Sequence, residues 1–487
     1  MRILYTLLWW LLLPLVFVRL AWRARRQPEY LQHIGERFGF YPDRDAPLRD
    51  SHVKPVIWLH AVSVGETRAT VSLVARLRAA YPGYRILLTH TTPTGRAAGE
   101  QLYGKDVLRV YLPYDYPFAV RRFLHHFRPQ LGILMETEIW FNLINAAHAA
   151  GVPMLLLNAR LSEKSAKGYG HAAGLTRNAL QQLAAIAAQT ADDAARLIQL
   201  GAQNVTVMGN LKFDIAPPQA MLESGKSLRK QFGATRQIFL LASTREGEEG
   251  LLLDAWQAQG FSANRHGASS SPEHKSACAG RFPDGATSHS TRLPKNVNQV
   301  SGYHPILPPE GEGENESLRD FHANVLLVIV PRHPQRFNEI ADMLSARGLR
   351  CQRRSTNSPV PADVQVVLGD SMGEMFAYYA ASDLAFIGGS LLPFGGQNLI
   401  EACAVGTPVL IGPHTHNFAD ATRLAVEAGA AIRVNNADEL FQTAQKLLND
   451  AGVLIEMRKQ GMQFVTAHQG ATDKAMAVID KMLGSRG

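Results

Sequence analysis

The sequence predicts an α/β protein with two Rossmann-like halves, each built on a parallel sheet that helices cover on both faces. Short apolar runs, such as VIWLH and VLLVIVP, alternate along the chain with segments that have the period of an amphipathic helix. This alternation is typical of parallel sheets, whose strands are buried on both faces. It occurs twice, and a chain of 487 residues is long enough for two or three domains. We therefore expect two domains that face a cleft, where ligands of such folds bind.

The first half of the chain alternates strand and helix patterns from residue 54 onward. Apolar runs bounded by polar or turn residues predict strands at residues 54–63, 84–90, 107–115, 131–140, 152–162, 184–190 and 205–213. Amphipathic or Ala-rich segments predict helices at residues 65–80, 95–102, 117–127, 141–151 and 192–202. The polar residues that end these strands are expected at the ligand-binding edge of the sheet.

The second half repeats the alternation, with one interruption. Strands are expected at residues 237–244, 324–334, 364–370, 383–390, 407–413 and 430–434. Helices are expected to begin at residues 246 and 398, to end at residues 346 and 379, and to close the chain as an amphipathic pair. Residues 260–324 break the pattern because they are rich in Ser, Gly, Pro, His and Asn and lack periodic apolar content. We interpret this stretch as a disordered insertion in a connection that is usually about 2–6 residues long.

These patterns predict the domain boundaries. We assign residues 1–26 to a membrane anchor with its basic flank and residues 27–215 to the first Rossmann-like domain. Residues 216–233, which begin APPQAMLESGKS, are expected to be a linker. Residues 234–487 are expected to form the second Rossmann-like domain, which contains the insertion.

The anchor is predicted from an uncharged apolar run at residues 3–18, which an arginine cluster follows. As a helix the run is about 24 Å long, slightly short of a hydrocarbon core of about 30 Å, and residues 19–22 could lengthen it. A cleaved signal peptide is disfavoured because the positive cluster follows the run; a buried helix is the third interpretation. The arginine excess after the run predicts a cytoplasmic body. Whether the segment spans the membrane or lies in the interface stays open.

Net charge and cysteine spacing limit the kinds of ligand and partner that the protein can bind. The formal net charge is +8, which favours an anionic partner such as a membrane, a phosphate-bearing substrate or a nucleic acid. Charge alone does not choose among these. The three cysteines lie far apart without a CxxC spacing, so a zinc or iron–sulfur site built on cysteines is excluded. The one D-x-D pattern, at Asp43 and Asp45, lies in a polar stretch and gives little support to a divalent metal site.

Acidic candidates gather at the ends of expected strands in the first half. Glu66, in HAVSVGE, is expected at a strand-to-helix junction, where a carboxylate can act as a general base; a first-turn Glu favoured by the helix dipole is the alternative. Glu136 and Glu138, in METEIW, would share one face of an extended chain, or would simply be solvated at the strand exit. Lys212, in GNLKFD, could meet an anion or could be an ordinary surface lysine.

Anion-binding signals gather in the second half. STREGEE and PRHP each follow an expected strand, and Arg332 of PRHP offers a planar fork to a phosphate. SMGE at 371–374 and NLIE at 398–401 each begin a helix and match the capping-box pattern, so they could be caps only. The glycines of residues 388–397 would let a ligand approach the backbone ahead of NLIE. The chain has neither a Walker A motif nor a G-x-G-x-x-G after a strand.

Together these motifs resemble the family of 3-deoxy-D-manno-oct-2-ulosonic acid (Kdo) transferases of lipopolysaccharide assembly. The resemblance runs along nearly the whole chain outside the insertion. It rests on the apolar segment followed by HIGERFG and then, in order, HAVSVGE, METEIW, GNLKFD, STREGEE, VPRHPQRF, GDSMGE and GGSLLPFGGQNLIEACAVGTPVLIGPHTHNF. So many long matches in one order are highly specific.

The resemblance implies a GT-B fold with an acceptor domain first and a nucleotide-sugar domain second. It implies an inverting transfer of Kdo from CMP-Kdo to the lipid A precursor lipid IVA, without a bound metal or other cofactor. The partners would be CMP-Kdo, the lipid A precursor and an anionic membrane leaflet, and not a nucleic acid. The protein would reside at the bacterial inner membrane, with its catalytic body in the cytoplasm.

The family's site residues fall on matching positions of this sequence. The proposed base is the glutamate of SVGE, which is Glu66 here. The acid of METE and the lysine of NLKFD, which the family assigns to stabilising the transition state, are Glu136, with Glu138 adjacent, and Lys212. The CMP contacts fall on Pro331, Arg332, Met372, Gly373, Glu374, Asn398, Leu399, Ile400 and Glu401.

The sequence departs from the family in two places. Gln397 stands where a GGHN-like pattern has His, which puts the donor contacts of that loop in doubt, and the insertion at 260–324 has no counterpart in typical members. Two other functions stay open. One is a glycosyltransferase of the same fold that uses a UDP- or ADP-sugar, which the released nucleotide would distinguish. The other is a non-catalytic nucleotide-binding scaffold, which would tolerate the loss of Glu66.

Overall fold

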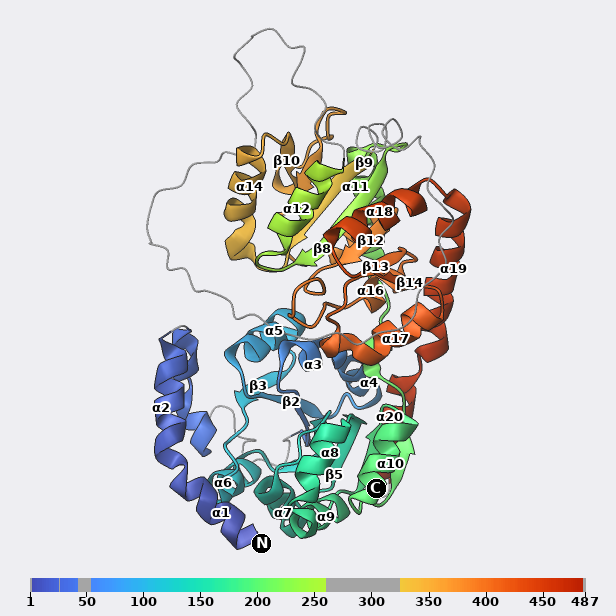
Figure 1. Cartoon of the computed structure of the whole chain (residues 1–487). Helices are drawn as coiled ribbons and strands as arrows, with labels where there is room; N and C mark the ends of the chain where they lie inside the picture. Colours follow the sequence, from blue (N-terminus) through green and yellow to red (C-terminus); the bar gives the residue numbers. More distant parts are fainter. Residues whose placement is uncertain (1, 26, 43–53, 260–324, 485–487) are drawn as a thin grey trace. The chain divides into compact units, whose positions relative to one another are not determined.

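The computed structural model describes residues 2–25, 27–42, 54–259 and 325–484 (Figure 1). The expected insertion at 260–324 and the pair Asp43 and Asp45 lie outside the described residues. The chain divides into two compact units. The first is Met1–Ile215 with Thr466–Gly487, and the second is Ala216–Val465. Each is an α/β unit, as the sequence predicts.

The first unit contains a seven-stranded sheet in the order β3-β2-β1-β4-β5-β6-β7. All of its pairs are parallel. The strand order reverses between β1 and β4, and open sheets of this kind bind ligands at such a reversal. The strands are β1 (Val56–His60), β2 (Arg85–His90), β3 (Leu108–Tyr111), β4 (Pro129–Met135), β5 (Met154–Ala159), β6 (Ala185–Ala188) and β7 (Val205–Val207).

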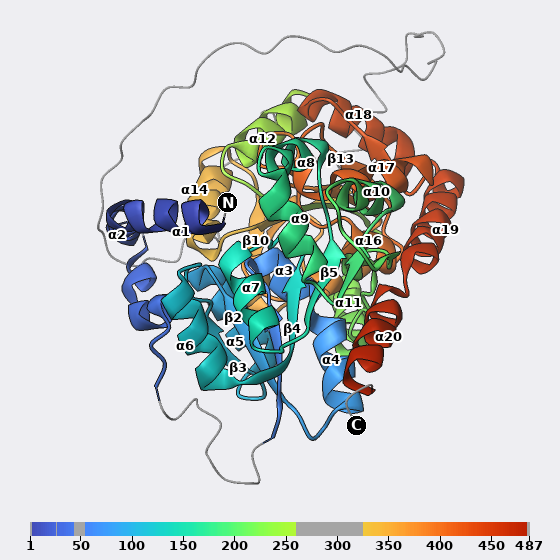
Figure 2. The same ribbon diagram turned by 90° about the horizontal axis from the view of Figure 1, so that it is seen from below.

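Helices cover both faces of this sheet because successive strand residues point to opposite sides. Val56 and Trp58 of β1 pack with α6, α7, α9 and α10, whereas Ile57 and Leu59 pack with α3, α4, α5 and α20 (Figure 2). The helices of this unit are α1 (Arg2–Leu11), α2 (Leu13–Ala24), α3 (Val64–Ala69), α4 (Val71–Ala80), α5 (Pro93–Tyr103), α6 (Pro117–Phe127), α7 (Phe141–Ala149), α8 (Glu163–Gly170), α9 (Ala173–Gln181), α10 (Ala191–Gln199) and α20 (Ala471–Gly484), with short 3-10 helices η1 (Pro28–Leu31), η2 (Ile34–Phe38) and η4 (Leu211–Phe213).

The second unit repeats this architecture. Its seven-stranded parallel sheet has the order β10-β11-β9-β8-β12-β13-β14, with the reversal between β8 and β12. The strands are β8 (Gln237–Thr244), β9 (Val325–Pro331), β10 (Cys351–Arg353), β11 (Val366–Leu368), β12 (Leu384–Ile387), β13 (Val409–Ile411) and β14 (Ala431–Arg433). The helices are α11 (Gln219–Phe232), α12 (Glu248–Ala258), α14 (Phe337–Ala346), α15 (Met375–Ala381), α16 (Ile400–Ala404), α17 (Ala419–Glu427), α18 (Ala437–Leu448) and most of α19 (Ala451–His468), with 3-10 helices η5 (Pro334–Arg336), η6 (Arg354–Thr356) and η7 (His416–Phe418).

Three sequence predictions about this architecture are wrong. The expected linker at 216–233 is largely helix α11, which packs tightly on α15: a Cβ at Gly225 would lie only 2.6 Å from Ala380 Cβ. The edge strand β10 was missed because it is Cys-Gln-Arg, of which only Cys351 is buried. The helix expected at 65–80 is two helices, α3 and α4, which meet at Thr70.

The carboxyl terminus was also assigned to the wrong domain. After β14 the chain forms α18, α19 and α20 rather than two helices, and Thr466–Gly487 belongs to the first unit. Ala475 and Ile479 of α20 are fully buried in the core beneath α4. The Asp214 carboxylate accepts hydrogen bonds from the backbone N–H groups of Gly470, at 2.7 Å, and Thr472, which hold the start of α20 beside the end of the first half.

The expected anchor is a bent pair of helices rather than one helix. A Pro in the first turn of α2 accompanies the break at Leu12, and α1 and α2 meet at 50°. Among the described residues no single helix is long and apolar enough to cross a membrane, although this bent pair passes the same test by length and composition. The pair is attached to the unit: the Tyr5 hydroxyl donates to Asp115 Oδ2 at 2.9 Å, and the Tyr116 hydroxyl donates to the Trp9 carbonyl at 3.0 Å.

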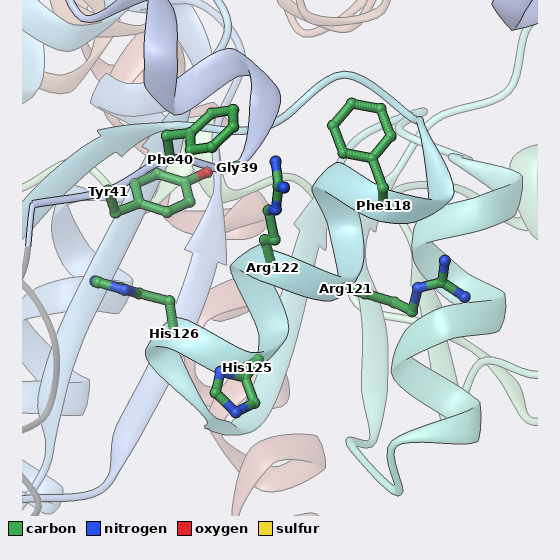
Figure 3. A pocket seen from close by; sticks show the side chains of 8 residues that line it. All are labelled: Gly39, Phe40, Tyr41, Phe118, Arg121, Arg122, His125 and His126. Carbon is green, nitrogen blue, oxygen red and sulfur yellow. The ribbon is translucent and has the colours of Figure 1, made fainter.

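The segment that follows α2 packs against α6 (Figure 3). Gly39 has a φ of 80° and approaches α6 so closely that a Cβ there would clash with the Ala119 carbonyl oxygen at 2.5 Å. Phe40 lies under the guanidinium of Arg122, 4.2 Å from its ring centre, and the Tyr41 hydroxyl donates to the Tyr111 carbonyl at 3.1 Å. The HIGERFG segment is therefore part of the folded unit.

Candidate functional site

The first cluster of functional side chains lies at the strand reversal of the first unit. β1 and β4 are hydrogen-bonded neighbours at the centre of the sheet. Glu66 lies in α3, just after β1, and Glu136 is the first residue after β4. Because both strands are parallel, both residues lie at the carboxyl edge of the sheet, where ligands bind in open α/β folds.

The Glu66 carboxylate is fixed by a capping box. Ser63 is the N-cap of α3, and its Oγ accepts from the Glu66 N–H at 3.3 Å and donates to Glu66 Oε1 at 3.0 Å. The Val62 N–H donates to Glu66 Oε2 at 2.8 Å. The helix-start interpretation of Glu66 is therefore geometrically correct. It does not compete with a catalytic role, because the same contacts hold the carboxylate in one orientation.

The environment of Glu66 shifts its acidity toward neutrality. Burial, followed by the charges of Glu136 and Glu138, raises the pKa of Glu66 to about 7, although hydrogen bonds from Val62 and Ser63 oppose the shift. A carboxylate with a pKa near neutral is well matched to removing a proton from a hydroxyl group at physiological pH. An ordinary cap glutamate would titrate near its usual value of about 4.3.

Glu136 faces Lys212. Its Oε1 lies 3.3 Å from Lys212 Nζ, and both side chains are about four-fifths buried. Glu136 has a φ of 57°, a left-handed conformation that is rare outside glycine and is found at functional turns. Lys212 lies in η4, where its N–H donates to the Asn210 side chain at 3.0 Å. Lys212 thus follows β7 by several residues instead of ending a strand.

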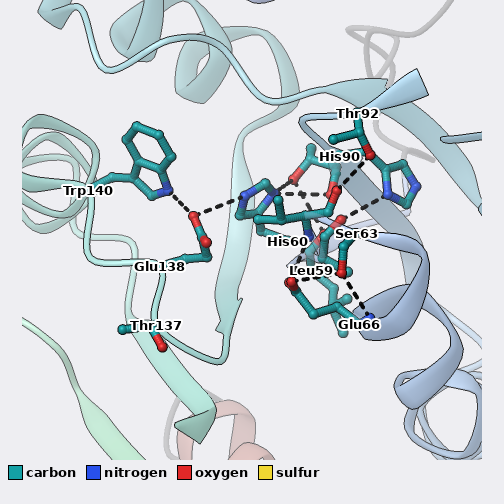
Figure 4. Close-up of polar contacts among 12 residues, drawn as sticks. Leu59, His60, Ser63, Glu66, His90, Thr92, Thr137, Glu138 and Trp140 are labelled. Atoms are coloured by element: carbon teal, nitrogen blue, oxygen red, sulfur yellow. Dashed lines mark hydrogen bonds and ion pairs between the residues drawn. The ribbon is translucent and has the colours of Figure 1, made fainter. Parts of the chain in front are cut away.

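Glu138 has other partners than Glu136, and the two do not lie on one extended strand as the sequence suggested. The strand ends at Met135, and the left-handed residue at 136 breaks the alternation of an extended chain. Glu138 Oε2 accepts from Trp140 Nε1 at 2.6 Å and lies 4.0 Å from His60 Nε2 (Figure 4). Burial, and more weakly the Glu136 charge, raise the pKa of Glu138.

Two buried histidines support this edge and were missed in the sequence. His60 ends β1 and His90 ends β2, at the last positions of two apolar runs. His60 Nδ1 lies 2.8 Å from Thr89 Oγ1, and His90 Nδ1 lies 2.9 Å from the Ala61 carbonyl. Burial lowers the pKa of His60 to about 3 and of His90 to about 4. Both imidazoles are therefore neutral at pH 7 and hold the loop that carries Glu66.

The second cluster lies at the strand reversal of the second unit. Gly388 follows β12 where that strand approaches β8, and a Cβ there would lie 2.6 Å from the Ser243 carbonyl oxygen. Glu248, which is fully buried, holds the glycine loop that begins here. Its carboxylate accepts from the backbone N–H groups of Gly389 at 2.6 Å, Arg245 at 2.9 Å and Leu391 at 3.1 Å. Glu248 lies within STREGEE but was not singled out in the sequence.

Three arginines lie at or near this edge of the sheet. Arg245 lies over the Phe394 ring at 4.7 Å, and Arg332 follows β9 with its N–H donating to the Thr244 carbonyl at 2.9 Å. Burial and the charges of Arg245, Arg332 and Arg336 lower the pKa of His333. The charge of Arg336 is neutralised by Glu249, whose Oε1 lies 2.7 Å from Arg336 Nη1. Arg245, which the sequence did not single out, and Arg332 supply positive charge at this edge.

The other predicted CMP contacts behave differently from one another. Glu374, not Ser371, is the N-cap of α15, so the two residues do not form a capping box at the helix start. They are still paired, because Ser371 Oγ donates to Glu374 Oε2 at 2.5 Å, while Glu374 Oε1 lies 3.3 Å from Arg354 Nη2. Asn398 Oδ1 does accept from the Ile400 N–H at 3.1 Å, and its Nδ2 donates to Glu401 Oε1 at 3.1 Å. Pro331 ends β9, and Met372, Gly373 and Leu399 complete the set.

The predicted site residues thus form two groups, one in each unit. Glu66, Glu136, Glu138 and Lys212 lie in the first unit. The predicted CMP contacts all lie in the second unit, after β9, β11 and β12. Among the described residues no group of three His, Cys, Asp or Glu side chains is placed to hold a metal ion. The first group can exchange protons, and the second can bind an anion.

Comparisons with known proteins agree on one family. Residues 32–215 match the family model described as 3-deoxy-D-manno-octulosonic-acid transferase (kdotransferase), and residues 322–464 match the model of group 1 glycosyl transferases. The chain is 40% identical to a 3-deoxy-D-manno-octulosonic acid transferase of Bordetella pertussis and 32% identical to one of Haemophilus influenzae. Each match covers 99% of this chain and 99% of the relative.

Solved structures agree on the fold. A glycosyltransferase from Rickettsia africae aligns with a TM-score of 0.51 at 12% identity and covers 88% of this chain and 99% of its own. A UDP-GlcNAc 2-epimerase from Neisseria meningitidis, bound to UDP-GlcNAc, aligns with a TM-score of 0.51 at 14% identity and covers 88% and 100%. At these identities the likeness concerns the fold alone, which consists of two parallel-sheet α/β domains and is GT-B-like.

Proposed function

The chain belongs to the 3-deoxy-D-manno-octulosonic acid (Kdo) transferase family and is a glycosyltransferase, and we propose that it transfers Kdo from CMP-Kdo to the lipid A precursor lipid IVA. The observation that carries the catalytic part of this proposal is Glu66. It is a rigidly held carboxylate at a strand reversal, and its pKa is raised to about 7. The proposed role of the enzyme is in lipopolysaccharide core biosynthesis.

The acidic cluster is proposed to act on the acceptor. Glu66 removes the proton from a glucosamine hydroxyl, whose oxygen then attacks the anomeric carbon of Kdo. The Lys212 ammonium and the Glu136 carboxylate lie 3.3 Å apart and hold each other in place. They supply one positive and one negative group where charge develops during the transfer. Glu138, which Trp140 holds at 2.6 Å, orients acceptor hydroxyls. Positioning the hydroxyl against Glu66 lowers the barrier further.

The basic cluster is proposed to hold the donor. CMP-Kdo carries a phosphate and a carboxylate, which match the guanidinium groups of Arg245 and Arg332 and the glycine loop that Glu248 holds. Residues 372–374 and 398–401 would contact the nucleotide. The bond between the anomeric carbon and the phosphate oxygen breaks as the acceptor oxygen bonds, and CMP leaves as an anion.

The reaction is proposed to be a single displacement that inverts the anomeric centre. Attack from the side opposite the phosphate needs one base for the incoming hydroxyl and a cationic site for the leaving group, and the two clusters offer these roles. We propose that Arg332 and backbone N–H groups stabilise the leaving phosphate, so that no resident metal or other cofactor is required.

A lipid acceptor is supported by a chain of aromatic contacts from the acidic cluster to α1. Trp140, which donates to Glu138, lies 6.4 Å from Trp9 of α1 between ring centres. Beyond Trp9 the surface is apolar: Leu4, Leu8 and Leu11 are 65%, 51% and 76% exposed. A lipid A precursor could lay its acyl chains on this surface while its sugar reaches Glu138 and Glu66.

The proposed location is the cytoplasmic face of the bacterial inner membrane, with α1 and α2 lying in the interface instead of spanning the bilayer. The hydrogen bonds of Tyr5 and Tyr116 support this, because they bind α1 along the folded unit. To distinguish an interfacial helix from a spanning one, spheroplasts that carry an Ile3→Cys variant are treated with a membrane-impermeant maleimide. An interfacial helix is labelled only after the membrane is opened, whereas labelling of intact spheroplasts would show that the segment spans.

The product test is direct. Purified full-length enzyme is incubated with CMP-Kdo and lipid IVA, and the products are analysed by mass spectrometry. We expect an acceptor heavier by whole Kdo residues and the release of CMP. Turnover with a UDP- or ADP-sugar and none with CMP-Kdo would assign another donor. Nucleotide binding without transfer, unchanged by Glu66→Gln, would indicate a scaffold.

A further inference from the structure

A groove lies between α1, α6 and α7, with a volume of about 860 Å³. Its walls are apolar where α1 contributes Ile3, Leu7 and Trp10. Arg2, Arg121 and Arg128 also line it, from the start of α1, the middle of α6 and the residue after α6. None of the described residues that line the groove is acidic. The lining thus combines an apolar wall with unopposed positive charge, in a volume typical of small-molecule sites.

The absence of acidic residues extends over the elements that form the groove. Between residues 2 and 28 the sequence has arginines but no Asp or Glu. Between residues 116 and 162 the only acids are Glu136 and Glu138, which belong to the catalytic cluster. Asp115, which accepts from Tyr5 and from the Asn142 N–H, is buried beside these elements. The described lining of the groove itself carries arginines without an acidic residue and attracts an anionic partner.

Neighbouring arginines on α6 have different surroundings, which identifies the residue that serves the groove. The Arg122 guanidinium stacks on Phe40 at 4.2 Å and on Phe118 at 5.3 Å. Figure 3 shows Arg121 pointing away from this aromatic pair. Arg121 and His125 line both the groove and a smaller hollow of about 480 Å³ beside Phe40, whereas Arg122 lines only the smaller hollow.

The groove runs from Pro117 and Asn142, at the starts of α6 and α7, to Arg128, and its Arg128 end is far from the catalytic cluster. It reaches Pro129, the first residue of β4, whereas Glu136 follows the last residue of that strand. A seven-residue strand rises about 3.3 Å per residue, so roughly 20 Å separate the two ends. An anionic group held at Arg128 therefore lies far from Glu66, which makes the reacting sugar of an acceptor the wrong occupant for this end.

We propose that the groove binds one anionic phospholipid of the membrane leaflet, with its phosphate against Arg2, Arg121 and Arg128 and an acyl chain along Ile3, Leu7 and Trp10. Two features select this occupant. The charge of the lining is positive without an acidic partner, and Ile3 and Leu7 remain 77% and 59% exposed although α1 is hydrogen-bonded to the unit. The proposal rests on the membrane location put forward under Proposed function.

The test compares two adjacent arginines. Full-length protein in a neutral detergent is titrated with phosphatidylglycerol or phosphatidylcholine, and bound lipid is counted by native mass spectrometry. Wild type should retain one phosphatidylglycerol and no phosphatidylcholine. Arg121→Gln should weaken phosphatidylglycerol binding at least fivefold, since one basic residue near an anionic surface contributes about that factor. Arg122→Gln removes the same charge one residue away and should leave binding unchanged.

The outcomes separate this proposal from the function on which it rests. Equal losses in Arg121→Gln and Arg122→Gln, or equal binding of both lipids, would overturn the groove and leave only diffuse attraction. Wild-type protein that binds neither phosphatidylglycerol nor phosphatidylcholine vesicles would overturn the membrane location itself. Kdo transfer by the wild type is measured separately, and its failure beside intact phosphatidylglycerol binding would remove the proposed reaction while the lipid site stands.

Discussion

The carboxyl edges of the two sheets have the same topology and opposite chemistry. In each unit the strand order reverses at the centre, between β1 and β4 or between β8 and β12. The first edge carries Glu66, whose pKa is raised to about 7 by burial and by neighbouring acids. The second carries Arg245 and Arg332, whose charges help lower the pKa of His333.

This difference shows that the loops, not the sheets, decide the chemistry. Both reversals place loop residues in a hollow edge where ligands bind. After β1 the loop forms a capping box that holds the Glu66 carboxylate. After β12 the loop is rich in glycine, and the buried Glu248 carboxylate holds its backbone. Glu248 is bound by backbone N–H groups and points inward, so it builds an anion site, whereas Glu66 is available to react.

The largest expected effect is on the acidic edge. Glu66→Gln should lower turnover by on the order of 10²–10⁴ and leave CMP affinity unchanged, because it removes the proposed general base while the proposed donor contacts lie in the other unit. Turnover and calorimetric CMP titration check this. Glu439→Gln is the matched control. Glu439 accepts from the Asn435 N–H at 2.8 Å at the start of α18, so it repeats the cap without the site. Similar turnover losses in both variants would reduce Glu66 to a cap.

A smaller effect is expected on the basic edge. Arg332→Lys and Glu401→Ala should each raise the CMP dissociation constant tenfold or more, equivalent to at least about 1.4 kcal/mol. In Arg332→Lys the loss is expected because one ammonium cannot replace a planar guanidinium fork. Arg423→Lys changes an exposed arginine, paired with Glu427 on α17, and should leave affinity unchanged. Unchanged affinity in both site variants would withdraw the assignment of these donor contacts.

Asn398, which lies one residue before the N-cap Leu399 of α16, should affect stability in addition to any contact with CMP. Asn398 Oδ1 accepts from the Ile400 N–H at 3.1 Å, so Asn398→Ala should cost about 0.5–2 kcal/mol of unfolding free energy. Chemical denaturation measures this cost. If CMP affinity of the folded variant falls tenfold while stability is unchanged, Asn398 contacts the donor directly and the capping interpretation fails.

The smallest expected effect is electrostatic. Glu136→Gln removes a negative charge that raises the pKa of Glu66, so this pKa should fall and the acid limb of the pH–rate profile should move to lower pH. Burial still acts, so the limb should stay above the ordinary range of a glutamate. Glu138→Gln should move it less, because its charge has the weaker influence of the two. A limb that neither variant moves would belong to another group.

The sequence predicted the two α/β units and the places of the candidate site residues at strand ends, because both depend on local patterns. Apolar runs identified nearly all strands, and polar residues at their ends identified Glu66 and Arg332. It missed what depends on contacts distant in sequence. Glu138 lies beside His60, which is far away along the chain, and Glu248 bonds to Gly389, 141 residues later.

Local rules also failed where a single backbone angle changed. Period-two alternation predicted that Glu136 and Glu138 share a face, but a left-handed residue at Glu136 ends the alternation. The helix α11 was taken for a linker because its sequence is polar and begins after a Pro-Pro pair; its packing on α15 through Gly225 could not be read from composition. The position of α20 against α4 likewise depends on tertiary packing.

The central claim is that one edge reacts and the other binds, and a single pH series tests it. The ratio kcat/KM and the CMP affinity of the wild type are measured from pH 5.5 to 8.5. The CMP affinity of Glu66→Gln is measured over the same range. Because Glu66 is active only when ionised and its pKa is about 7, kcat/KM should fall tenfold per pH unit below about 7. The phosphate of CMP itself titrates near pH 6, so the affinity curves of the two proteins should coincide. Turnover that stays level down to pH 5.5, or affinity curves that separate, would contradict the division of roles.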